Sequence, residues 1–120
     1  MLIQKQDAEG QIIIKSYQPG LIRLNIGEFK QVILLQNGAM GVFDADASFD
    51  QLSPERLKDI IKDKPEVLII GSGEKHQMLP ISLAINQQGI AVESMASREA
   101  CHTYQMLVYE QRRVYALIFP

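Results

Sequence analysis

Apolar residues in the second half of the chain form short continuous runs that alternate with runs of helical spacing. The sequence Val-Leu-Ile-Ile-Gly-Ser-Gly at 67–73 predicts a buried strand that ends in a glycine-containing turn. A helical pattern begins near Pro80, and it is followed by a strand over 89–95, a helix over 97–110 and a strand over 114–119. This β-α-β-α-β order predicts a sheet with helices packed on it and with functional loops at the strand ends.

The first half of the chain is rich in glycine and in short segments with strand character. Strands are predicted over 12–17, 21–26 and 29–35, and Pro19-Gly20 marks a turn between the first two. The last of these segments contains four consecutive apolar residues, which indicates burial on both faces. We therefore expect an antiparallel meander or a pair of hairpins ahead of the α/β region.

Helix boundaries are marked by capping residues. Ser53 followed by Pro54 is typical of an N-cap and a first helical position, and Pro65 ends that helix near the preceding residue. Gly89 is placed to follow the C-terminus of the helix that begins near Pro80. Ser97 is predicted to cap the next helix.

Composition narrows the class of protein. A chain of 120 residues with 47% hydrophobic and 22% charged residues predicts one globular domain over 1–120. The net charge of −2 argues against nucleic acid as a partner, because phosphate contacts need a basic surface. Cys101 is the only cysteine, which excludes an internal disulfide and a cysteine-rich zinc site.

The hydropathy pattern also bears on where in the cell the protein is located. The first ten residues have no apolar segment of signal-peptide length, and no apolar run approaches the roughly 20 residues that cross a bilayer. We expect a cytoplasmic protein without membrane insertion.

Four segments together resemble a known family: 65–73, 89–95, 100–104 and the closing strand that ends at 117–118. The chain resembles a small α/β domain family of unknown biochemical function, which includes a mitochondrial complex I assembly factor and an adipogenesis-associated animal protein. The resemblance covers nearly the whole chain. It implies a single α/β domain with a central mixed sheet, flanking helices and an N-terminal antiparallel β layer. It also implies a role with partner proteins and no established catalytic activity.

The sequence departs from the family pattern at two positions. Gln105 stands where an asparagine is common, which weakens any mechanism that needs an amide of fixed reach. Gln111 stands where a glycine is common, and we expect a different turn into the last strand.

The turn at 71–76 is a candidate binding site for a small anion. The backbone amides of Gly71, Ser72 and Gly73 can converge on a negative group, and Lys75 and Arg98 are candidates for a positive charge beside it. The motif is neither a P-loop nor GxGxxG. The alternative is that the glycines only permit a tight turn.

Three side chains are candidates for catalysis. Cys101 lies near the start of a helix, where the dipole lowers a thiol pKa and favours a nucleophilic thiolate, although a small buried cysteine is the simpler interpretation. Glu93 is a candidate base if its face of the strand is buried, and a helix-capping or ion-paired acid otherwise. His76 reaches either of them only through the fold.

No pattern indicates a metal, a flavin or a nicotinamide cofactor. Asp44, Asp46 and Asp50 lack the central glycine and the twelfth-position glutamate of an EF-hand loop, so we interpret this run as a solvated connection. The first hypothesis is a non-catalytic binding or assembly module that contacts partner proteins, with a small anionic ligand at the 71–76 turn. The alternative is a small enzyme or a metabolite-sensing domain that uses the crevice between 71–76 and the start of the 97–110 helix.

Overall fold

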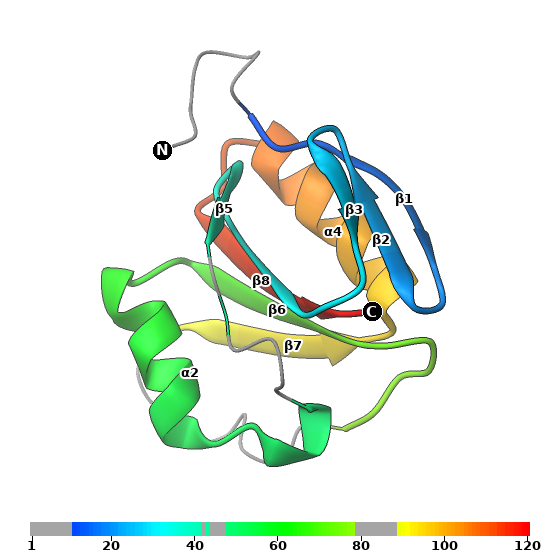
Figure 1. Cartoon of the computed structure of the whole chain (residues 1–120). Helices are drawn as coiled ribbons and strands as arrows, with labels where there is room; N and C mark the ends of the chain where they lie inside the picture. Colours follow the sequence, from blue (N-terminus) through cyan, green and yellow to red (C-terminus); the bar gives the residue numbers. More distant parts are fainter. Residues whose placement is uncertain (1–10, 42, 44–47, 79–88) are drawn as a thin grey trace.

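The computed structural model describes residues 11–41, 43, 48–78 and 89–120, and it contains two sheets (Figure 1). A three-stranded antiparallel sheet comes first in the chain, and a five-stranded mixed sheet follows. The strands are β1 (Ile14–Gln18), β2 (Leu21–Leu24), β3 (Gly27–Phe29), β4 (Ile33–Gln36), β5 (Ala39–Gly41), β6 (Val67–Ser72), β7 (Ala91–Met95) and β8 (Val114–Phe119). The predicted α/β fold with a mixed sheet and an N-terminal antiparallel layer is confirmed.

The larger sheet has the strand order β5-β4-β8-β6-β7. Strand β6 pairs in parallel with both β7 and β8, whereas β4 pairs antiparallel with β8 and β5. All six residues of β6 and all six of β8 are buried, as expected for central strands covered on both faces. Because β6 is central, the turn that follows it lies between the ends of its neighbours.

The two faces of the larger sheet are covered by different elements (Figure 1). Helix α4 (Ser97–Tyr109) and the three-stranded sheet cover one face, and α2 (Pro54–Ile60) covers the other. Alternate residues of β6 therefore join two separate cores: Ile69 belongs to the core that contains Tyr104 of α4, and Ile70 to the core that contains Leu57 of α2. Helix α4 also contacts β1, so it lies between the two sheets.

The N-terminal strands differ in detail from the prediction. The segment 21–26 ends as a strand at Leu24, and Phe29 belongs to a separate short strand rather than to the start of β4. Strand β5 was not predicted. It forms a hairpin with β4 through Asn37 and Gly38, which both take positive φ values of 54° and 91° as in a tight hairpin turn.

The predicted start of α2 is confirmed, because the Ser53 side chain accepts a hydrogen bond from the Arg56 amide at 3.3 Å and Pro54 is the first helical residue. The helix ends earlier than predicted, and a 3₁₀ turn at Ile61–Asp63 carries the chain on toward Pro65. Another 3₁₀ turn at Phe49–Gln51 precedes α2.

The predicted cap of α4 is wrong. Ala96 is the N-cap, and Ser97 is instead the first helical residue. Its side chain instead bonds the backbone of Gly73 and Phe119, which lie outside the helix. The helix predicted near Pro80, and the acidic residues Asp44 and Asp46, lie outside the described residues.

Helix α4 ends just before Gln111, the residue that stands where the family commonly has glycine. This residue takes a left-handed conformation with φ of 64°, the one that glycine favours. The Gln111 amide bonds the Val108 carbonyl at 2.9 Å and the Arg112 amide bonds the Leu107 carbonyl at 3.0 Å, which is the Schellman arrangement. The glutamine thus adopts the conformation that glycine favours.

Candidate functional site

The turn after β6 is bonded directly to the start of α4. The Gly73 amide donates to Ser97 Oγ at 2.8 Å, and the Ser97 hydroxyl donates to the carbonyl of Phe119 at the end of β8. The Ser97 amide in turn donates to the Gly73 carbonyl at 2.8 Å. One buried serine therefore joins the ends of two strands to the first turn of a helix.

Ser72 is engaged in the same way. Its Oγ lies within hydrogen-bonding distance of the carbonyls of Lys75 (2.8 Å) and Met95 (3.2 Å), and it accepts from the Gln77 amide at 3.0 Å. Gly71, Ser72 and Gly73 are all buried, whereas Lys75 is exposed. The polar groups that would cradle an anion at this turn are thus used largely within the protein.

The space between the turn and the helix is filled. A Cβ placed on Gly71 would lie 2.8 Å from Ser97 Oγ and 3.0 Å from Ala100 Cβ. Glycine is needed at this position because the helix packs against the strand at backbone distance. The predicted crevice between 71–76 and α4 is therefore a packed contact at Gly71.

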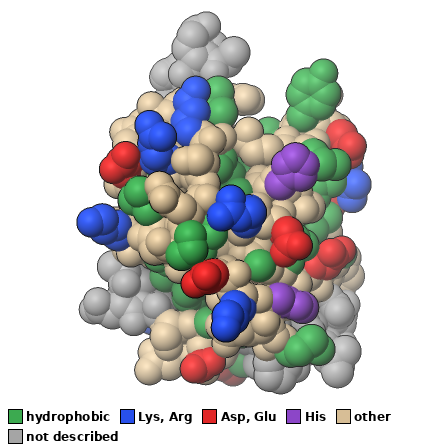
Figure 2. Space-filling model, turned by 90° about the vertical axis from the view of Figure 1, so that its right-hand side faces the viewer, with side chains coloured by type: hydrophobic (Ala, Val, Ile, Leu, Met, Phe, Trp, Pro, Cys, Tyr) green, Lys and Arg blue, Asp and Glu red, His purple; other side chains and the backbone are tan. Residues whose placement is uncertain are grey.

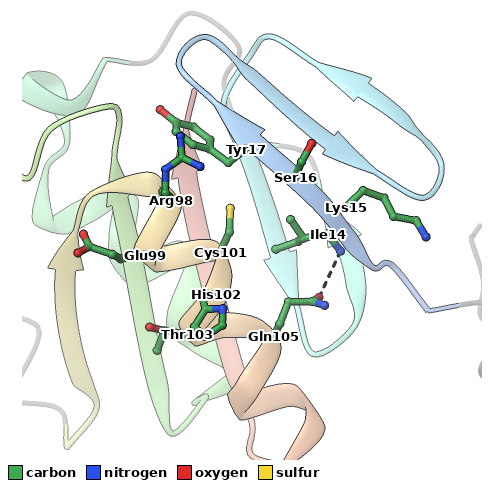
Figure 3. Close-up of a pocket in the computed structure, with 10 residues that line it drawn as sticks. All are labelled: Ile14, Lys15, Ser16, Tyr17, Arg98, Glu99, Cys101, His102, Thr103 and Gln105. Carbon is green, nitrogen blue, oxygen red and sulfur yellow. Dashed lines mark hydrogen bonds between the residues drawn. The ribbon is translucent and has the colours of Figure 1, made fainter.

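A cleft of about 720 Å³ lies instead between β1 and the first half of α4 (Figure 3). Strand β1 forms one wall and the helix forms the other. The lining residues are Ile14, Lys15, Ser16, Tyr17, Arg98, Glu99, Cys101, His102, Thr103 and Gln105. Gln105 spans the cleft at one end, where its Oε1 accepts a hydrogen bond from the Ile14 amide at 3.3 Å.

A β-bulge shapes the strand side of the cleft. Ile14 pairs with Leu24 and Ser16 pairs with Arg23, so β1 has one residue more than β2 between these two pairs. In a regular strand, residues three apart face opposite sides. The extra residue places both Ile14 and Tyr17 against the α4 side, where both join the same hydrophobic core.

Arg98 and Tyr17 meet at the other end of the cleft (Figure 3). The Arg98 guanidinium carbon lies 5.6 Å from the centroid of the Tyr17 ring, a cation–π geometry. Burial raises the pKa of Tyr17, as do the nearby charges of Glu74 and Cys101, and Arg98 opposes these effects. Because Glu74 follows Gly73, this end of the cleft lies close to the turn at 71–76.

Cys101 is buried and lies on the helix side of the cleft. Burial raises the pKa of its thiol to about 11, and the positive charge of Arg98 offsets only part of this. The pKa is thus raised, not lowered as expected for a helix N-terminus, and loss of hydration at this buried position is its main cause. The interpretation of Cys101 as a small buried residue is confirmed.

The other two catalytic candidates lie elsewhere. Glu93 is exposed on β7, so the burial that the base hypothesis required is not met. His76 is also exposed, and its Nε2 lies 3.2 Å from Ser94 Oγ. Neither residue lines the cleft that contains Cys101. In the described part of the chain, Glu93, His76 and Cys101 thus do not form one catalytic group.

Among the described residues there is no group of three or more His, Cys, Asp or Glu side chains that could hold a metal ion. None of the helices in the described ranges is long and apolar enough to cross a membrane.

The sequence did not single out three residues of the cleft: Ile14, Lys15 and Tyr17. The pattern that could have indicated them, the bulge in β1, is weak in the sequence. Lys15 and Ser16 are consecutive polar residues within an otherwise alternating strand, which is the pattern that an inserted bulge residue produces.

These features define a small α/β domain with a cleft between its N-terminal antiparallel sheet and the helix α4. The chain belongs to a family of proteins of unknown function, DUF498/DUF598, whose model matches residues 14–119. The family resemblance inferred from the sequence is thereby confirmed.

Two relatives and one solved structure are informative. The "13 kDa major membrane protein" of Francisella tularensis subsp. holarctica (strain LVS) is 36% identical over 98% of both chains. NADH dehydrogenase [ubiquinone] 1 alpha subcomplex assembly factor 3 of Xenopus tropicalis is 26% identical over 83% of this chain, which spans 46% of that protein. An NMR structure of a Xanthomonas campestris protein superimposes with a TM-score of 0.84 at 23% identity, over 99% of this chain and 92% of the other.

Proposed function

We propose that this protein is a non-catalytic binding or assembly module that contacts partner proteins through the outer face of α4. The observation that carries this proposal is an exposed stripe on the helix, made of His102, Met106 and Tyr109 and called the α4 stripe below. These residues are four and three apart, so they share one helical face. Met106 is 49% exposed and Tyr109 is 89% exposed.

Exposed large apolar and aromatic side chains on one face favour protein contact, because such residues form the centres of interfaces. Figure 2 shows the side of the molecule on the right of Figure 1, where hydrophobic side chains and histidines lie among charges of both signs. The Xenopus relative is named as an assembly factor, which supports a role with partner proteins. The separation of Glu93, His76 and Cys101 gives less support to an enzyme.

Partner recovery from the native host tests this proposal. Tagged protein is crosslinked gently in cells and purified, and wild type is compared with the double variant Met106→Ser, Tyr109→Ser. The matched control is Met78→Ser, which replaces a methionine that is 79% exposed outside α4. We expect a stoichiometric partner with wild type and the control but not with the double variant, at equal thermal stability. Equal recovery by all three proteins, or no partner with wild type, would count against the proposal.

A second candidate function is metabolite sensing without turnover. The β1–α4 cleft favours it, since its volume of about 720 Å³ lies within the range of small-molecule sites. Native mass spectrometry of protein purified from its host tests this candidate. A bound mass that leaves on denaturation supports it, and a bare chain counts against it.

Location in the cytoplasm remains our expectation from the hydropathy pattern. The Francisella relative is named a membrane protein, so cell fractionation is the direct test. Recovery of the protein in the soluble fraction supports the expectation. Recovery with membranes that persists after a high-salt wash contradicts it.

A further inference from the structure

The β1–α4 cleft carries a positive charge in an acidic protein. Lys15 and Arg98 contribute two positive charges and Glu99 contributes one negative charge, which gives +1 with His102 neutral. The whole chain has a net charge of −2. The cleft therefore differs in sign from the chain as a whole, and it favours an anion.

Arg98 is arranged to bind such a group. Its guanidinium makes no hydrogen bond or ion pair with any residue in the described part of the chain, and its known contact is the ring of Tyr17. The aromatic face limits the orientations of the guanidinium and leaves its N–H groups for a ligand. A planar carboxylate is the natural partner of this fork, because two parallel hydrogen bonds form at once.

The hydroxyl of Tyr17 is a second polar group without a partner. Tyr17 is only 7% exposed, and its hydroxyl oxygen has no hydrogen-bond partner among the described residues. Buried polar atoms are nearly always bonded, so this hydroxyl is an unsatisfied polar group beside the cleft. Figure 3 shows this side chain reaching from β1 across to Arg98.

The middle of the cleft suits an apolar group. Cys101 lies on the helix wall next to Arg98, and Ile14 lies on the opposite wall, nearer to Gln105 (Figure 3). Cys101 is buried and its thiol is a weak polar group, so this part of the wall is effectively hydrophobic. An apolar wall with a few convergent polar groups is the usual construction of a small-molecule site.

We propose that the β1–α4 cleft binds a small monocarboxylic acid, with its carboxylate on Arg98 and its apolar body between Ile14 and Cys101. Glu99 offsets one of the two positive charges, so a ligand with one negative charge leaves the cleft neutral. This inference rests on the ligand-binding part of the proposed function. It transfers the anion contact from the turn at 71–76 to Arg98, and it does not depend on the α4 stripe.

Titration of the purified, isotope-labelled protein tests this site, with amide chemical shifts as the measurement. The probes are octanoate, octylammonium and octyl phosphate, which share one apolar chain and differ in head-group charge. The variant Arg98→Gln is compared with Arg23→Gln. Arg23 is an exposed residue of β2, between the buried Ile22 and Leu24, and it forms an ion pair with Glu28. Because that pair is exposed, its loss has little effect on the fold.

We expect saturable shifts with octanoate, confined to β1 and α4, and affinity lower by at least about tenfold in Arg98→Gln but unchanged in Arg23→Gln. If Arg98→Gln does not give a folded spectrum, Arg98→Lys replaces it, and weaker octanoate binding is again expected because the fork is lost. Three results would each overturn the proposal. They are equal octanoate affinity with and without the arginine, absence of saturable shifts at the cleft, and tighter binding of octylammonium or octyl phosphate than of octanoate. The crosslinking experiment tests partner contact and the titration tests carboxylate binding. Failure to recover a partner would not change the titration result, so the two proposals can be contradicted independently.

Discussion

The hydroxyl oxygen of Ser97 accepts the amide hydrogen of Gly73 at 2.8 Å, and the same hydroxyl donates to the carbonyl of Phe119. One side chain thereby satisfies a buried donor and a buried acceptor from two different strand ends. This arrangement explains why the turn after β6 is closed against the start of α4.

Replacing Ser97 with alanine should lower the free energy of unfolding by about 2 kcal/mol, because both backbone groups lose their partner while they stay buried. Urea unfolding followed by circular dichroism measures the change. The control Ser94→Ala removes a hydroxyl whose bonds to His76 and Gln77 are solvent-exposed, so its effect should be within about 0.5 kcal/mol. Similar losses in both variants would contradict this account.

Replacing Gly71 with alanine should destabilise the protein by about 1–3 kcal/mol, because the new Cβ would overlap Ser97 and Ala100. The neighbours are a helix backbone and a short side chain, so neither can move aside cheaply. Thermal unfolding measures the loss. In the control Gly41→Ala, the new Cβ meets the end of the flexible Gln36 side chain, and we expect a smaller shift in melting temperature.

Replacing Gln111 with glycine should stabilise the protein by about 1 kcal/mol, because a left-handed conformation strains every residue with a Cβ. Chemical denaturation measures the gain. The adjacent variant Glu110→Gly is the control, since Glu110 has φ of −79° and gains nothing from glycine. A loss of stability in Gln111→Gly would show that the side chain contributes more than the strain costs.

Cys101 should react slowly with iodoacetamide in the native protein. With a pKa of about 11 rather than 9.0, its thiolate fraction at pH 8 is lower by about a hundredfold, and burial restricts access further. Mass spectrometry of the alkylated protein, with and without denaturant, measures the difference. Ready modification of the folded protein at pH 6 would instead identify an activated thiol.

Stability should fall in alkaline solution. Burial raises the pKa of Cys101 from 9.0 to about 11 and that of Tyr104 from 10.0 to about 12. The unfolded chain ionises first, so the stability present below pH 9 is lost as the pH rises through about 9 to 12.

Denaturation midpoints measured between pH 7 and pH 11 test this dependence. The variant Cys101→Ala should lose part of the dependence above pH 9, because it removes the group with the lower pKa. A flat profile in the wild type would contradict the burial of both groups.

Much of the fold was predictable because it follows from local pattern. The continuous apolar run at 67–70 predicted a buried strand, and Ser53 with Pro54 predicted the start of α2. The hairpin of β4 and β5 was missed although Asn37-Gly38 is a strong turn signal, because the strand after it is only three residues long.

The candidate site was less predictable than the fold. The sequence suggested Gly71, Ser72 and Gly73 because glycine-rich turns after strands often bind anions. Only the packing of α4 shows that their hydrogen bonds are used by Ser97 and by nearby backbone groups. Tyr17 lies 81 residues before Arg98 in the chain, so no local pattern could have paired them.

Local pattern in the sequence predicted most of the described strands and helices, the family and the burial of the central strands, since these depend on hydrophobic periodicity and on residues near in the chain. Tertiary structure alone decided which polar groups are free. The Gly73 amide is satisfied by a serine 24 residues away, and the β1 bulge turns Tyr17 toward Arg98. The physical reason is that a hydrogen bond or a desolvated charge depends on distances in space, which pairing register and helix packing set.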